Sequence, residues 1–451
     1  MSVLRIAWKS LRQRSLASFL TALSVALGVA MLVAVLVTVG IVERLFSQTG
    51  AGYDLLIGAR GSETQLVLSS IYRIEKPIEN LPYRYYKELE NDPRVDKVVP
   101  LTIGDATERG NFPIVGTTTR YFTLPAARRD GKAVEFRLRG KPMQGPWDAV
   151  IGSEVARTND WDLGATFKLI HAGQNDHVHD EEFTVTGILE PTGTPNDRTA
   201  FVALAGFLSL GDHAKPVDEA VAAEARFFGE SEEDVRAMYQ EKIDKLVWVP
   251  EHGHFHGEMP DLMKEVTALL VTTKQESAGS LSGQMRAFNM RNDINSEQRA
   301  LAVNPISVMS KLNRILLGPI DTAAKAIAGV IIVVTGIGVF VSIYNSMSDR
   351  RREIGIMRAL GARRGTVLSI ILIESALLCL LGGLAGLLLG HAAVFAAAPI
   401  LLSKAGILID PWAVEPVELW VLPVLLGLGV LVGILPGLTA YRTDVATALE
   451  A

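Results

Sequence analysis

The sequence is almost without cysteine: among 451 residues, only Cys379 is one. A disulfide framework and a zinc site built on several thiolates are therefore excluded. The sequence contains no G-x-x-x-x-G-K-[ST] stretch, so it has no phosphate loop for ATP. It also lacks H-E-x-x-H, which excludes a protease of the zincin type.

Four long runs are apolar and almost without charge, and the third, from Gly365 to about Leu402, is interrupted only by Glu374 and His391. Residues 16–42 contain no charged side chain, and a helix of that length would be about 40 Å long, against a hydrocarbon core of about 30 Å. This first run is too long for a signal peptide, so we expect it to be retained. The predicted transmembrane helices cover residues 16–45, 316–348, 366–402 and 418–441.

The distribution of basic residues predicts the orientation in the membrane. Cytoplasmic segments are enriched in Lys and Arg, which assigns three segments to the cytoplasm: 1–15, 349–365 and 442–451. The long segment 43–321 holds 41 acidic and 31 basic residues, a net charge of −10, and is placed outside. Its acidity gives no reason to expect a nucleic-acid partner. The predicted outer parts are a large domain at 46–315 and a loop at 403–417.

The outer domain is predicted to be of the α+β class. Strand-like runs at 53–61, 95–106 and 268–274 alternate with helical patterns such as 81–92. The stretch 212–245 is rich in Glu, Asp and Ala and predicts an inserted pair of acidic helices, exposed and mobile. A helical pattern is predicted from about 296 to 325.

Two further patterns concern the membrane helices. The stretch "VLRIAWKSLRQRS" within residues 1–15 indicates either an amphipathic helix on the inner membrane surface or a solvated lead-in. Small residues recur every fourth position in the last two spans, which favours close packing of helices, although glycine is also simply common there. The glycines concerned are Gly382, Gly386, Gly390, Gly429, Gly433 and Gly437.

Segment 349–364 is short, basic and amphipathic. Ile354, Met357 and Leu360 are expected on one side of a helix, and six arginines occupy much of the rest. Such a helix could dock in a groove on a soluble partner, with its arginines paired to carboxylates. The alternative is a basic hairpin that has no partner.

The stretch "REIGIMRALGARRGTVLSIILIESALLCLLGGLAGLLLG" (352–390) resembles the FtsX-like permease domain shared by the MacB, lipoprotein-release (LolC/LolE) and FtsX families. The end "LPGLTAYRTDVATALEA" (435–451) is similar to the end of that domain. Stretches 113–124, 149–169 and 183–204 resemble the MacB-type periplasmic core. The acidic helices and the histidine stretches depart from the common pattern.

The resemblance implies a type VII ABC transporter subunit with four transmembrane helices and a large α+β extracytoplasmic domain between the first two. It would act as a dimer in the bacterial inner membrane, driven by a separate cytoplasmic ATPase dimer that holds ATP and Mg²⁺. The segment between the second and third spans would be the coupling helix. The residues assigned to the ATPase groove are Arg352, Glu353, Ile354, Gly355, Arg358, Ala359, Leu360 and Gly361.

Two functional readings follow from the resemblance, and a third combines it with the histidine stretches. The first is a mechanical permease that exports, extracts or releases an envelope substrate (lipoprotein, lipid, peptide or drug), with a periplasmic or outer-membrane partner. The second is an FtsX-like signalling scaffold that activates an envelope enzyme. The third is a transport or sensing system linked to zinc.

The zinc reading depends on the histidines, seven of which lie in the outer segment. Alternating residues of an extended chain point to one side, so grouped histidines can present several imidazoles together. Imidazole with carboxylate suits Zn²⁺, Cu²⁺ or Ni²⁺, whereas a merely polar loop would bind none. The predicted metal ligands are His177, His179, His252, His254 and His256, with His171, Asp180, Glu181 and Glu182 near the first pair.

Overall fold

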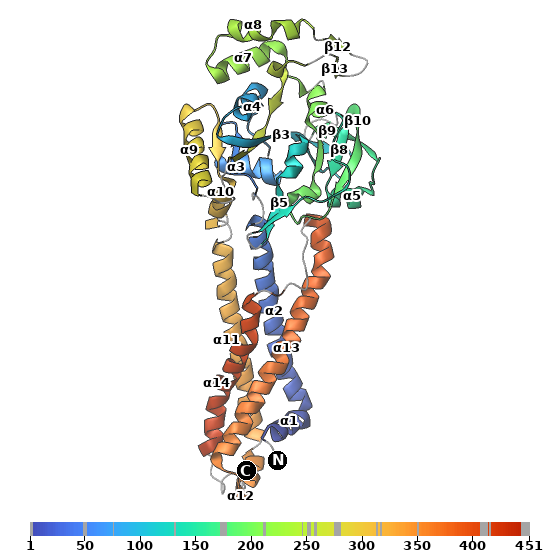
Figure 1. Cartoon of the computed structure of the whole chain (residues 1–451). Helices are drawn as coiled ribbons and strands as arrows, with labels where there is room; N and C mark the ends of the chain where they lie inside the picture. The colour runs from blue at the N-terminus through green and yellow to red at the C-terminus, as the bar shows by residue number, and fades with distance from the viewer. Residues whose placement is uncertain are drawn as a thin grey trace. The chain divides into compact units, whose positions relative to one another are not determined.

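The chain forms two compact units in the computed structural model: residues 1–43 with 315–451, here the membrane unit, and residues 44–314, here the α+β unit (Figure 1). The structure describes residues 3–47, 52–74, 76–129, 132–171, 178–210, 213–245, 247–249, 254–256, 259–274, 281–312, 314–315, 318–349, 351–405, 414 and 416–442.

All regular secondary structure in the described residues of the membrane unit is helical. Four of its helices are long and apolar enough to cross a membrane, over residues 15–38, 318–345, 364–399 and 418–439. This confirms the predicted fold class, and the ends differ from the predicted spans by a few residues. The helices are α1 (Val3–Gln13), α2 (Ser15–Ser47), α11 (Gly318–Asp349), α12 (Arg351–Ala359), α13 (Arg364–Ala405) and α14 (Val421–Arg442).

The amphipathic helix α1 packs against α13. Its small face is buried at Ala7, Ser10 and Leu11, while Trp8 is half exposed. The hydroxyl of Ser10 donates a hydrogen bond to Oε1 of Glu374 over 3.3 Å. A carboxylate within an apolar span is costly unless it has polar partners, and α1 supplies one of them.

The α+β unit is organised around one ten-stranded sheet. The strand order is β16 (Leu301–Val303), β1 (Leu55–Gly58), β15 (Ala268–Thr273), β3 (Val95–Thr107), β4 (Pro113–Thr117), β11 (Ala200–Ala203), β8 (Asp148–Ile151), β10 (Val178–Leu189) and β7 (Leu138–Gly140), with β9 (Thr166–His171) paired to both β10 and β3. Three small pairs accompany it: β2 (Leu81–Pro82) with β14 (Glu265–Val266), β5 (Pro125–Arg129) with β6 (Lys132–Glu135), and β12 (Val247–Val249) with β13 (His254–His256).

Strand β9 closes part of this sheet into a ring. Pairing runs from β3 through β4, β11, β8 and β10 to β9, and from β9 back to β3. One apolar cluster lies on the strands of this six-stranded ring and includes Phe167, Leu169 and Phe183, all fully buried. Strand β3 is long enough to belong to both the open sheet, where it pairs with β15, and the ring.

Eight α-helices complete the α+β unit in its described residues: α3 (Glu63–Val67), α4 (Tyr83–Glu90), α5 (Ser153–Asn159), α6 (Leu204–Ser209), α7 (Val217–Phe228), α8 (Glu232–Ile243), α9 (Leu281–Glu297) and α10 (Pro305–Leu312). A second apolar cluster joins β1, β15 and β3 to α4 and α9. The unit therefore has its own core, as its lack of disulfides requires.

Of the two acidic helices predicted to be exposed, α7 is partly buried, which corrects the prediction for that helix, while most of α8 is exposed as predicted. Ala220, Val221 and Ala225 of α7 are buried in a small cluster with residues of the neighbouring segments. Glu224 is 1% exposed and accepts hydrogen bonds from Arg84 over 3.2 Å and from the Tyr239 hydroxyl over 3.0 Å. Small apolar residues at helical spacing make this docking face, and the many acids around them obscured it in the sequence.

The helical pattern predicted for 296–325 is also corrected. Leu301–Val303 form β16, which pairs with β1 at the sheet edge, and α10 follows it. Oδ1 of Asn295 accepts a hydrogen bond from the Ala302 N–H over 2.8 Å, and Nδ2 of Asn295 donates one to the Ala302 carbonyl over 3.0 Å. Three residues are too few for a period of two to be recognised, so only the tertiary pairing identifies this strand.

Candidate functional site

The predicted coupling helix is a real helix, α12, and its apolar residues are divided between two directions. Ile354 is 4% exposed and belongs to the apolar cluster of the membrane helices, and Met357 packs against that cluster. Leu360 is 84% exposed and Ile356 is 46% exposed. Part of the face expected to bind a partner therefore anchors α12 to its own bundle, and the exposed apolar pair is Ile356 with Leu360.

The other predicted coupling residues differ in accessibility. Gly355 is buried, Arg358 is half-buried, and Ala359 and Gly361 are exposed. Arg352 and Glu353 lie within α12, and their side chains are outside the described part of the structure.

Gly361 ends α12 in a left-handed conformation. Its φ is +95°, its N–H donates to the Arg358 carbonyl over 3.0 Å, and the N–H of Ala362 donates to the Met357 carbonyl over 3.0 Å. These two bonds are the pair of a Schellman motif, which usually places glycine at the left-handed position. The motif holds Leu360 at the end of the helix, where it is exposed.

We expect Gly361→Ala to weaken this helix end by about 1–2 kcal/mol, because an L-residue is strained at positive φ. Hydrogen–deuterium exchange of peptides covering 357–362 should become faster. The matched control is Gly365→Ala, since a Cβ added at either glycine meets no atom within 4 Å and Gly365 has no positive φ. Equal exchange in the two variants would contradict this account.

The structure places all six predicted packing glycines against neighbouring helices. A Cβ added to Gly382, Gly386 or Gly390 would lie 2.5–2.8 Å from the Cβ of Val25, Val29 or Val33 on α2. The second set, Gly429, Gly433 and Gly437 on α14, would meet Cys379, Ser375 and Leu368 on α13 at 2.5–2.9 Å. The partners of these helix faces, which the sequence did not specify, are therefore α2 and α13.

Four side chains of types that bind metal ions lie close together at the strand ring of the α+β unit. Asp105, His171, His179 and His213 each offer one ligand atom, and these atoms all lie within 4.8 Å of one another. Asp105 Oδ1 is 3.1 Å from His171 Nδ1, and Asp105 Oδ2 is 3.0 Å from His213 Nε2 and 3.7 Å from His179 Nε2. The three imidazole rings contact one another, with centroids 4.7–5.5 Å apart.

The carboxylate at the centre of this group is buried. Burial alone would raise the pKa of Asp105, but His213, His171 and His179 together outweigh it and keep the pKa below its usual value. A carboxylate that stays ionised in a buried place has to be compensated by positive charge. Independently of this pKa, the four ligand atoms lie close enough together to share one cation.

Only one of the predicted metal ligands, His179, belongs to this group. His177 and His252 fall outside the described residues, and His254 and His256 lie on β13, where no side chain is described. Asp105 and His213 were not identified from the sequence, and His171 was noted only as a neighbour of the first histidine pair. Asp105 stands on an apolar strand 66 residues before His171, so no local spacing reveals it.

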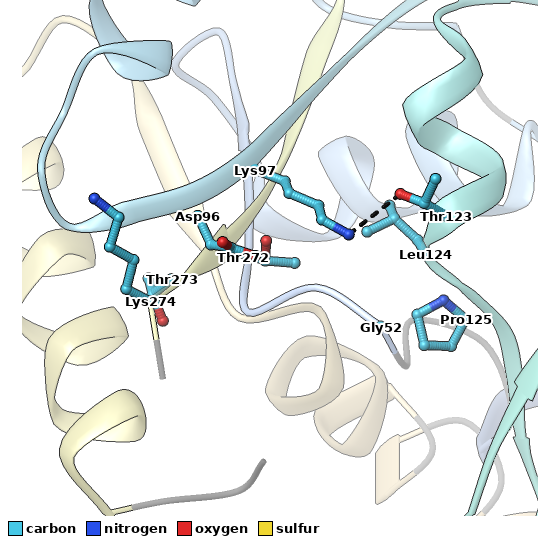
Figure 2. A pocket seen from close by; sticks show the side chains of 9 residues that line it. All are labelled: Gly52, Asp96, Lys97, Thr123, Leu124, Pro125, Thr272, Thr273 and Lys274. Carbon is cyan, nitrogen blue, oxygen red and sulfur yellow. Dashed lines mark hydrogen bonds between the residues drawn. The ribbon is translucent and has the colours of Figure 1, made fainter. Parts of the chain in front are cut away.

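A second polar site is the open cavity of about 320 Å³ lined by Gly52, Asp96, Lys97, Thr123, Leu124, Pro125, Thr272, Thr273 and Lys274. Figure 2 shows Lys97 directed toward Thr123, to which it donates a hydrogen bond over 3.4 Å, and Lys274 directed to the opposite side. The ammonium groups of Lys97 and Lys274 do not point to a common place, so the described residues of this cavity form no defined anion site.

Comparison with known proteins agrees with this architecture. The family model of the MacB-like periplasmic core domain matches residues 18–243, and that of the FtsX-like permease C-terminal domain matches residues 325–445. MacB of Shewanella sp. (strain ANA-3), a macrolide export ATP-binding/permease protein, is 28% identical over 367 residues, which cover 79% of this chain and 50% of MacB. YknZ of Bacillus subtilis (strain 168), an uncharacterized ABC transporter permease, is 47% identical over 70 residues, or 16% of this chain and 18% of YknZ.

Among solved structures, the periplasmic region of MacB from Actinobacillus actinomycetemcomitans matches 61% of this chain and 98% of its own, with a TM-score of 0.33 at 11% identity. The chain spans about half the length of the MacB relatives it matches. The periplasmic-core model alone covers half of the sequence, and the permease model covers three of the four candidate spans in whole or in part. The chain belongs to the MacB-type family of FtsX-like permeases.

Proposed function

We propose that this chain is the transmembrane subunit of a mechanotransmitting ABC transporter, driven by a separate cytoplasmic ATPase. The observation that carries the proposal is the two-sided helix α12. Ile354 fixes one side to the membrane helices, and Leu360 with Ile356 presents an apolar surface on another side. Exposed apolar anchors with nearby arginines suit a groove on a soluble partner.

The connections of α12 support a mechanical role. It follows α11 after one residue and precedes α13, and Ile354 shares one apolar cluster with Val367 and Ile371 of α13. Because packed helices move as bodies rather than deform continuously, displacement of α12 would move α11. In the sequence, α2 leads into the α+β unit and α11 follows it, so both are placed to pass such motion on.

The separate ATPase is supported by the sequence itself. The 451 residues contain no phosphate loop, and the matching MacB relatives are named as ATP-binding/permease proteins. In the proposed complex, ATP and Mg²⁺ are bound by the partner. The basic segments 1–15, 349–365 and 442–451 face the cytoplasm, and the α+β unit lies outside and handles the envelope substrate.

A homodimer is part of the proposal, and α11 supports it. Only 22% of its most apolar 18-residue window is buried within the chain, against 39–44% for the other three candidate spans. An open groove of about 570 Å³ between α2 and α11 is lined by small and polar residues, among them Thr21, Ser24 and Ser342. Such residues favour contacts between helices in lipid. In the proposed homodimer, a helix of the second copy makes these contacts.

The test is co-expression of the tagged full-length chain with ABC ATPases of the MacB-type systems of its own organism. We expect one ATPase to co-purify, a native mass that corresponds to two copies of each subunit, and ATP hydrolysis that rises when both are present. A chain that purifies as a monomer, and that changes the hydrolysis rate of none of these ATPases, would overturn the proposal.

A further inference from the structure

We propose that the α+β unit binds a divalent transition metal ion, preferentially Zn²⁺, between Asp105, His171, His179 and His213. The inference goes beyond the proposed transport function and does not depend on it. It rests on the convergence of four ligand side chains, whose candidate ligand atoms all lie within 4.8 Å of one another.

The closed strand ring is what brings these residues together. Asp105 of β3 and His171 of β9 are direct partners in the antiparallel pairing of these strands. His179 lies on β10, the other neighbour of β9, and His213 follows α6, which packs against β4 and β11 of the same ring. Three ligands thus stand on adjacent strands of a rigid sheet, which holds them in place without an ion.

Along β9, His171 continues the buried face of the strand. Phe167 and Leu169 alternate with it and belong to the apolar cluster of the ring. The polar group is therefore seated at the end of an apolar core. A polar cluster in such a place is costly unless a charge or a ligand satisfies it.

The hydrogen bond of His213 fixes which of its ring nitrogens faces the other three side chains. Nδ1 of His213 is 3.0 Å from the carbonyl oxygen of Phe207, which can only accept, so Nδ1 carries a proton. The other ring nitrogen, Nε2, lies 3.0 Å from Oδ2 of Asp105. Both atoms are possible metal ligands, and they belong to the same close group of four.

The same contact has the form of a metal-ligand support. A ligating histidine commonly donates its second ring N–H to a backbone carbonyl, which fixes the ring and its tautomer. The Phe207 carbonyl has this relation to His213, and the Phe207 ring packs on the imidazole at 4.2 Å between centroids. His213 is thereby held with Nε2 toward the other three ligands.

The donor set selects the kind of ion. Three imidazole nitrogens and one carboxylate oxygen suit Zn²⁺, Cu²⁺ or Ni²⁺ and are unsuited to Ca²⁺ or Mg²⁺, which take oxygen ligands. Four protein ligands match the tetrahedral coordination of structural zinc and leave no position open for a reacting water. We therefore assign the site to structural support or regulation rather than to catalysis.

Access to the site is from the side of His171. The His171 side chain is 36% exposed, while those of Asp105, His179 and His213 are 4–9% exposed. An ion can reach His171 from solvent and is then enclosed by the other three. A partly exposed first ligand and buried remaining ligands favour slow release of the ion.

The experiment uses the full-length chain in detergent, stripped of metal, with Zn²⁺ itself as the probe. Affinity is measured by competition with a chromophoric chelator, and stoichiometry by elemental analysis. Two triple variants each lose three histidines: H171A/H179A/H213A removes the proposed ligands, and H252A/H254A/H256A is the matched control. A monodisperse peak in size-exclusion chromatography shows that each variant is folded.

The expected result is one Zn²⁺ per chain in the wild type and in the control, with affinity lowered more than about 100-fold in the ligand variant. This threshold follows because loss of a supporting partner alone costs about 10–100-fold. Co²⁺ bound to the wild type should show the strong visible bands of four-coordinate cobalt, and this readout remains if the ligand variant does not fold. Zinc binding lost only in the control, no tight binding in the wild type, or six-coordinate Co²⁺ would each overturn the proposal.

Discussion

Gly386→Leu is expected to disrupt the packing of α13 against α2. A Cβ at this position would lie 2.5 Å from the Cβ of Val29 and 2.6 Å from the backbone oxygen of Ala26. The oxygen belongs to the helix backbone and cannot turn away as a side chain does, so the helices would have to separate. Overpacking of this kind costs about 1–3 kcal/mol and occasionally more. We expect a clear fall in thermal stability and in the yield of monodisperse protein.

The control for this prediction is Gly427→Leu, which adds the same side chain to an apolar helix. A Cβ at Gly427 meets no atom within 4 Å. It should leave the unfolding temperature of the purified chain nearly unchanged. If the two variants lost stability equally, the effect would come from leucine in a membrane helix in general, and the close contact between α13 and α2 would not be the cause.

Leu360→Asp is expected to abolish stimulation of the partner ATPase, with at least a tenfold loss. Leu360 is 84% exposed and touches no core, so the free energy of unfolding should not change. In the proposed complex the same side chain fills an apolar groove, where a buried, unpaired carboxylate is costly. The measurement is ATP hydrolysis by the reconstituted complex, with chain stability followed in parallel.

Leu360→Met is the conservative comparison, because it keeps an apolar side chain of similar volume. It should retain most of the stimulation. Normal hydrolysis with Leu360→Asp would place the contact elsewhere on the chain and remove the main support for α12 as the coupling element. Loss of stability in this variant would instead show that Leu360 is not a free surface residue.

The membrane helices were predictable because the lipid imposes a local rule. A span needs about 20 apolar residues, whatever surrounds it. The predicted spans and the observed helices accordingly agree within a few residues, from α2 to α14. The helix partners were not predictable: glycine spacing marks a face that allows close approach, but Val29 on α2 is opposite Gly386 only in the folded bundle.

In the α+β unit, the sequence indicated most long strands and missed what depends on pairing. The strand β16 has three residues, and only its register with β1 defines it. The buried face of α7 could not be recognised from the sequence, because it includes the acidic residue Glu224. In the structure this carboxylate is paired with Arg84. Short strands and buried charges depend on contacts between residues that are far apart in the chain, and local periodicity gives no information about such contacts.

The metal-site prediction shows the same division. The sequence drew attention to histidines that are close together, such as His177 and His179, because proximity in the chain is all that a sequence displays. The structure groups His179 with Asp105 and His213, which are 108 residues apart. Their convergence depends on β9 joining two edges of a sheet into a ring.

By itself the sequence determined the membrane spans, the α+β class of the domain between them and the helix that joins the second and third spans. These follow from hydrophobic length, strand and helix periodicity and charge bias, each of which acts over a few residues. Only the tertiary structure decided which side of α12 is exposed, which helices the glycines contact and which four side chains surround a common point. Those features depend on strand register and helix packing, which bring together residues that are far apart in the chain.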